Sequence, residues 1–210
     1  FDVMRFLSVP IGLGLFFISN QFVVLLYGAD FAPSGPILAL MGLVLIPTYQ
    51  NILLGQFLTS TDRQNLWTVV MLVATALTLP LDLLLVPWCQ QVFSNGAIAG
   101  SLSFLITEVG MVVAGIWLLP KGALSPATIG TGLRILVAGL AMAACAWLLR
   151  DFFILIPIVA GGIVYIGMIL LVRAIPADDL ELFKQLGRNG LNRLRRRNAD
   201  TIPAEGAHSQ

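Results

Sequence analysis

The stretch that decides the fold runs from Leu66 to Val86 and reads LWTVVMLVATALTLPLDLLLV, with Asp82 as its only charged residue. A helix needs about 20 predominantly apolar residues to cross the hydrocarbon core of a bilayer, so this stretch predicts a transmembrane helix. The rest of the chain is similar, because 58% of its 210 residues are hydrophobic and only 11% are charged. A soluble domain is about a quarter charged. The composition therefore predicts an integral membrane protein.

Apolar runs of similar length lie on both sides of this stretch. The six predicted spans are Phe6–Tyr27, Ile37–Leu58, Leu66–Val86, Ala97–Leu119, Thr128–Leu149 and Phe152–Ala174. The breaks carry turn residues, and the break after the third span is expected to run from Pro87 to Gly96. The runs lack both the two-residue alternation of a membrane β-barrel and the polar stripe of a soluble bundle. We therefore expect an all-α, polytopic membrane protein.

The basic residues predict the orientation of these spans. With the C-terminus in the cytoplasm, eleven of the twelve Lys and Arg residues lie at or near the inner face, and only Arg150 lies outside. We expect four spans in residues 1–119, a further hairpin pair in 120–175 and a basic tail in 176–210. The tail predicts either an amphipathic interfacial helix, whose Arg193–Arg197 end binds anionic lipids, or a topogenic stop signal; from Asn198 onward we expect disorder.

Polar residues within the spans are the first candidates for function, because each costs free energy unless it is paired or wetted. Glu108 lies near the middle of the fourth span, and Asp82 lies near the outer end of the third. Glu108 is expected either to couple transport to a proton or cation, or to be a neutral acid bonded to a neighbouring helix. Asp82 has the same alternatives, although water is closer. Arg134 either snorkels to the headgroups or binds a lipid phosphate.

Amide side chains form the second set of candidates. In the second span, Gln56 shares a predicted face with Tyr49, whereas Gln50 and Asn51 point elsewhere, so the amides serve two surfaces. They either bond neighbouring helices or bind hydroxyl groups of a sugar. Asn20, near the outer end of the first span, is a weaker candidate of the same kind.

The sequence offers no recognisable catalytic or metal-binding motif. It has no Walker loop, no His-rich cluster and no nucleophile beside a base, and the predicted loops are too short for a soluble catalytic domain. We expect no enzyme activity, no cofactor, no metal and no nucleic-acid partner.

The order of several short motifs resembles one family. Its members combine a Pro–Gly helix, an apolar-aromatic-Gly turn, a polar inner turn ending in Arg, a Leu-rich outer end with Pro, and a small-residue helix with Thr-Glu. The corresponding segments are Phe6–Leu15 (FLSVPIGLGL), Val23–Ser34 (VVLLYGADFAPS), Gln56–Arg63 (QFLTSTDR), Leu83–Trp88 (LLLVPW) and Asn95–Leu102 (NGAIAGSL) followed by Thr107-Glu108. Over about residues 6 to 119 the chain resembles polysaccharide flippases of the multidrug/oligosaccharidyl-lipid/polysaccharide exporter superfamily. Thr61 stands where that family more often has glycine, and Asp82 where it often has a neutral polar residue.

The resemblance implies a fold of two helical lobes around a central cavity. This chain, which begins with Phe1 and lacks a signal-peptide pattern, would be the C-terminal part of a fourteen-helix protein. The implied function is to flip a lipid-linked oligosaccharide (a polyprenyl-pyrophosphate-linked repeat unit) across the bacterial inner membrane by alternating access. Polysaccharide assembly proteins are implied partners. The alternatives are a multidrug/cation antiporter of the same fold, a membrane-embedded polysaccharide polymerase or ligase, and a scaffold subunit that transports nothing.

Overall fold

The computed structural model describes residues 2–120, 126–149 and 152–172, all within the first of the chain's two compact units, Phe1–Ala174. These residues form helices and contain no strand, which confirms the predicted all-α fold. The helices are α1 (Asp2–Tyr27), the short 3₁₀ helix η1 (Ala29–Ser34), α2 (Gly35–Ser60), α3 (Gln64–Phe93), α4 (Ile98–Leu118), α5 (Pro126–Leu148) and α6 (Leu155–Leu171). The predicted tail, including Arg193–Arg197, lies outside the described residues, as do Arg150 and Asp151.

Five of the helical segments are long and apolar enough to cross a membrane, and they fit a multi-pass membrane protein. The sixth predicted span is shorter than expected, because α6 has 17 residues and begins at Leu155, not at Phe152. At 1.5 Å per residue this helix is about 26 Å long, slightly less than the hydrocarbon core. Pro157 explains its start, since proline has no N–H to donate and fits best in the first turn of a helix.

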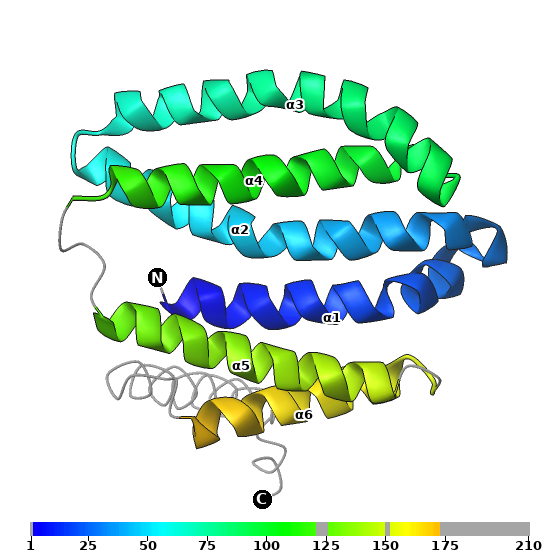
Figure 1. Cartoon of the computed structure of the whole chain (residues 1–210). Helices are drawn as coiled ribbons and strands as arrows, with labels where there is room; N and C mark the ends of the chain where they lie inside the picture. The colour runs from blue at the N-terminus through cyan, green and yellow to red at the C-terminus, as the bar shows by residue number, and fades with distance from the viewer. Residues whose placement is uncertain (1, 121–125, 150–151, 173–210) are drawn as a thin grey trace, which may run out of the picture. The chain divides into compact units, whose positions relative to one another are not determined.

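The predicted break from Pro87 to Gly96 is wrong over most of its length. Helix α3 continues through Pro80 and Pro87 as far as Phe93, and its C-terminal part bends (Figure 1). Bilayer helices tolerate proline better than soluble helices do, at the cost of a bend. The connection shrinks to Ser94–Ala97, where the side chain of Gln90 accepts a hydrogen bond from the Gly96 N–H at 2.8 Å.

The described helices lie side by side in the order α3, α4, α2, α1, α5, α6 (Figure 1). Glycines allow the closest approach. A Cβ on Gly42 of α2 would come within 2.8 Å of the Gly12 carbonyl oxygen of α1. Small residues bring bilayer helices together in this way, where burial of apolar surface gives little driving force. Helix α3 stands at one edge of the row and buries only a small part of its surface.

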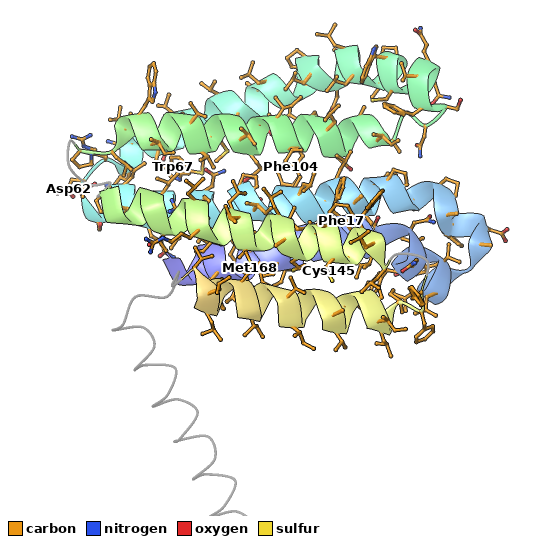
Figure 2. The ribbon with its side chains drawn as sticks, turned by 60° about the horizontal axis from the view of Figure 1, so that its bottom comes forward. Phe17, Asp62, Trp67, Phe104, Cys145 and Met168 are labelled. Carbon is orange, nitrogen blue, oxygen red and sulfur yellow. The ribbon has the colours of Figure 1, made fainter. Side chains whose placement is uncertain are left out.

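The turn between α2 and α3 joins one end of this row. Asp62 adopts the left-handed conformation there, with φ of 57°, a region that Asp visits more readily than most residues (Figure 2). The next residue, Arg63, donates from its guanidinium to the Leu118 carbonyl oxygen at 2.5 Å. A cation at the C-terminus of a helix is favoured by the helix dipole, so Arg63 ties the α2–α3 turn to the end of α4.

Candidate functional site

A groove of about 610 Å³ between α2, α3 and α4 gathers several of the predicted polar residues. We call it the polar groove. Helix α2 supplies most of its wall, with side chains three or four positions apart that share a helix face. Its lining residues are Thr48, Asn51, Ile52, Gly55, Gln56, Thr59 and Ser60 of α2, Trp67 and Met71 of α3, and Glu108 of α4.

Asn51 and Glu108 are joined by two hydrogen bonds at the wall of the polar groove. The Asn51 amide nitrogen donates to the Glu108 carboxyl Oε2 at 2.8 Å and to the Glu108 main-chain oxygen at 2.9 Å. Because a main-chain carbonyl can only accept, the amide must turn its nitrogen toward Glu108. This contact fixes the orientation of an amide that otherwise could be flipped.

That orientation leaves the other end of the Asn51 amide without a partner. Asn51 is only 5% exposed, and its Oδ1 is buried and accepts no hydrogen bond within the described part of the chain. A buried acceptor left unsatisfied costs about 1–3 kcal/mol. A hydroxyl group, a water molecule or an N–H group that entered beside Asn51 would recover this free energy.

The helices that form the polar groove contain two acids and no base. Neither Lys, Arg nor His occurs in α2, α3 or α4, so Glu108 is bonded to an amide and not to a cation. Apart from Glu108, the polar side chains of the lining are neutral amides and hydroxyls. Such a surface can exchange many hydrogen bonds with a ligand while it keeps one group for a positive charge.

The other predicted acid, Asp82, lies outside this groove. Its Oδ1 is 2.5 Å from the hydroxyl oxygen of Ser103, so the pair bridges α3 and α4. Ser103 is completely buried.

The remaining predicted residues are dispersed over other helices. Gln50 accepts a hydrogen bond from the Arg5 Nε at 3.0 Å and thus faces α1. Asn20 is exposed and lines a separate cavity of about 350 Å³ with residues that include Phe152 and Phe153. Arg134 is exposed on α5, which packs on α1 and not on the helices of the polar groove. The sequence predicted that the amides of α2 serve two surfaces and that Asn51 points away from Gln56. The prediction for Asn51 is wrong, because Asn51 and Gln56 both line the polar groove.

Sequence reasoning missed Trp67, the only aromatic residue of the polar groove. Its ring fits between two glycines, since a Cβ on Gly55 would lie 2.8 Å from the Trp67 Nε1 and one on Gly115 would lie 3.0 Å from the Trp67 ring. The sequence signal for this packing site is one glycine on each neighbouring helix, Gly55 and Gly115. These glycines identify the site only when the registers of all three helices are known.

A second, apolar groove of about 330 Å³ runs between α3 and α4. Thr107 is its only polar side chain; the other lining residues are Val69, Val70, Val73, Ala74, Leu77, Leu81, Ile106, Gly110, Met111 and Ala114. Adjacent residues enter different grooves, because Thr107 lines this groove while Glu108 lines the polar one. The two grooves therefore use the same stretch of α4.

Comparisons of the chain with protein-family models, curated proteins and solved structures found no match. The class that the fold defines is an all-α protein whose apolar helices fit a multi-pass membrane protein.

Proposed function

We propose that this chain is part of a membrane transporter that moves a lipid-linked oligosaccharide from one leaflet to the other by alternating access. The observation that carries the proposal is the polar groove, in which hydroxyls, amides and one tryptophan line a hollow between apolar helices. A sugar headgroup needs many hydrogen bonds to replace its hydration in the hydrocarbon core. The exposed Gln56, Thr59 and Ser60 side chains of the lining can donate hydrogen bonds to a sugar and accept them from it.

The apolar groove supports an amphiphilic substrate. It lies between α3 and α4, next to the stretch of α4 that carries Glu108, and it offers hydrocarbon surface without charge. In this arrangement the lipid tail stays beside α3 in the apolar groove, and the sugar headgroup enters the polar groove. Each part of the substrate then contacts a surface of matching polarity. The substrate class is thus a sugar attached to a long hydrocarbon, and a polyprenyl-pyrophosphate carrier satisfies it.

The proposed setting follows from the charge distribution and from the family resemblance. The protein belongs in the bacterial inner membrane with its C-terminus in the cytoplasm, and the chain supplies helices of the second lobe. The basic tail binds anionic lipids. Polysaccharide assembly proteins are proposed as partners of the whole protein. Since Arg134 is on α5, away from the polar groove, a role in binding the pyrophosphate requires a different stage of the transport cycle.

Two threonines provide a matched test of the polar groove. Thr59 lines the groove and Thr75 lies on the exposed surface of α3, and each donates its hydroxyl to the carbonyl oxygen four residues earlier. We expect Thr59→Val to slow the transfer of a fluorescent lipid-linked oligosaccharide in vesicles about fivefold to tenfold, the equivalent of one hydrogen bond. Thr75→Val should leave transfer unchanged. Equal rates for both variants and the unaltered protein would contradict a sugar site in the polar groove.

A cation antiporter is the second candidate, and the carboxyl of Glu108, whose hydrogen-bond partner is the neutral Asn51 amide, favours it. With no base in α2, α3 or α4, Glu108 can exchange a proton for a cationic drug. The two candidates differ in their substrate. A flippase transfers the lipid-linked oligosaccharide in vesicles, whereas an antiporter takes up a lipophilic cation. Glu108→Gln should abolish the dependence of either activity on an ion gradient, and unchanged transport would exclude Glu108 as the coupling group.

A further inference from the structure

Pro10 removes one hydrogen bond from the ladder of α1. The helix runs without a break from Asp2 to Tyr27, although Pro10 lies inside it. In an α-helix the N–H of each residue donates to the carbonyl oxygen four residues earlier, so position 10 would serve the carbonyl of Phe6. Proline has no N–H to donate, and it commonly bends a helix at this point. The Phe6 carbonyl oxygen therefore cannot receive the amide hydrogen bond that another residue at position 10 would supply.

Tyr165 of α6 donates a hydrogen bond to this same oxygen. Its hydroxyl lies 2.8 Å from the Phe6 carbonyl oxygen, and the centroids of the two rings are 5.6 Å apart. Tyr165 is only 3% exposed, so the contact is buried within the bundle. A carbonyl oxygen can only accept, so the phenol hydroxyl is the donor. Bilayer helices tolerate proline where a neighbouring helix satisfies the freed backbone group, and α6 fulfils that condition here.

The turn of α1 around Pro10 also contacts α5 and leads to α2. A Cβ on Gly139 of α5 would come within 2.5 Å of the Val9 Cγ1, so glycine allows α5 to lie directly against this turn. The part of α1 before Pro10 carries Arg5, which donates to Gln50 of α2. A bend of α1 at Pro10 would therefore displace contacts with both α5 and α2.

We infer that the Tyr165 hydroxyl replaces the missing amide donor of Pro10, so that α6 restrains the bending of α1. With this hydrogen bond formed, the Phe6 carbonyl keeps a donor and α1 continues through Pro10. When α6 moves away from α1, the carbonyl loses the Tyr165 hydroxyl and α1 can bend at Pro10. Tyr165 acts through α1 and is thus a positioning residue. The inference does not depend on transport or on which substrate is carried.

A double-mutant cycle on the full chain in bicelles tests the replacement of the donor. Pro10→Ala restores an N–H that can donate to the Phe6 carbonyl, so the Tyr165 hydroxyl becomes redundant. We expect Tyr165→Phe to lower the equilibrium constant for folding about tenfold when residue 10 is proline, and about twofold or less when residue 10 is alanine. Tyr49→Phe removes a hydroxyl from α2 and is the matched control. Its effect should be the same with proline and with alanine at position 10.

Distances between two spin labels in lipid vesicles test the restraint on bending. Labels at Leu7 and Leu25, which are both exposed on α1, lie on opposite sides of Pro10 once the two native cysteines are replaced. We expect a narrow distribution of distances when Tyr165 is present and a broader one in Tyr165→Phe. The distribution should become narrow again when Tyr165→Phe is combined with Pro10→Ala.

Both measurements can overturn the inference. Equal losses of folding from Tyr165→Phe with proline and with alanine at position 10 would show that the hydroxyl does not replace the amide donor. A distance distribution that Tyr165→Phe leaves unchanged would show that α6 does not restrain α1. If Tyr165→Phe alone does not fold, Pro10→Ala should rescue it, and a double variant that still does not fold contradicts the inference.

Discussion

Each of the two acids in α3 and α4 is bonded to a neutral group. Glu108 takes its hydrogen bond from the Asn51 amide, and Asp82 meets the Ser103 hydroxyl. At the residue scale this is the main result, because neither contact is an ion pair and each joins α4 to a neighbouring helix, α2 through Asn51 and α3 through Asp82.

Asn51 provides the sharpest prediction at this scale. Asn51→Ala removes the donor of two hydrogen bonds and leaves the Glu108 carboxyl and main-chain oxygen without it. We expect the free energy of unfolding to fall by about 1–3 kcal/mol, measured by denaturant titration in bicelles. Asn20→Ala is the control, because that amide is exposed, and its effect should stay within about 0.5 kcal/mol. Equal losses for the two variants would show that the Asn51–Glu108 contact does not stabilise the fold.

The sequence identified both acids and most of the amides, but not their partners. A polar residue in an apolar run is visible from composition alone, which is why Asp82 and Glu108 were found. Ser103 and Thr48 are common residues of apolar helices, and only the register of neighbouring helices shows that they line a groove or meet an acid. That register could not be derived while α3 was expected to end before Pro87.

At the scale of helices, contact between α1 and α2 depends on glycine. A Cβ on Gly42 would lie 2.8 Å from the Gly12 carbonyl oxygen and 3.1 Å from the Phe16 nitrogen, and main-chain atoms cannot move aside. We expect Gly42→Ala to destabilise the protein by about 1–3 kcal/mol in the same bicelle titration. Gly110 is also within a helix but has nothing within 4 Å of its added Cβ. Gly110→Ala should therefore be neutral or stabilising by up to about 1 kcal/mol. If Gly42→Ala and Gly110→Ala destabilise the protein equally, the close contact of α1 and α2 at Gly42 is refuted.

Helix positions were the most predictable feature, and helix ends the least. All six apolar runs are helices, and five of the helical segments have the length and composition needed to cross about 30 Å of hydrocarbon. The ends depend on local chemistry, such as the fit of Pro157 in the first turn of α6 and the left-handed conformation of Ser94 at the C-cap of α3. Proline marked a boundary at Pro157 but only a bend at Pro87.

For the described molecule as a whole, the helices form a row whose edge helix α3 is the least buried of the long spans (Figure 1). Large apolar side chains such as Leu84, which is 72% exposed, project from it. Exposed apolar surface of this extent is unfavourable in water and ordinary in a bilayer. The central claim is therefore that this surface faces lipid while the polar groove, a short distance away, is wet.

Spin-label accessibility in vesicles tests that claim most directly, with single cysteines introduced at Leu84 of α3 and Gln56 of the polar groove after Cys89 and Cys145 are replaced. The account predicts that lipid-soluble oxygen relaxes the label at Leu84, and that a water-soluble nickel complex relaxes the label at Gln56. A label at Ile135, which is buried, should respond weakly to both. If the nickel complex reaches Leu84 as readily as Gln56, or if only oxygen reaches Gln56, the account of apolar helices around a wet groove is contradicted.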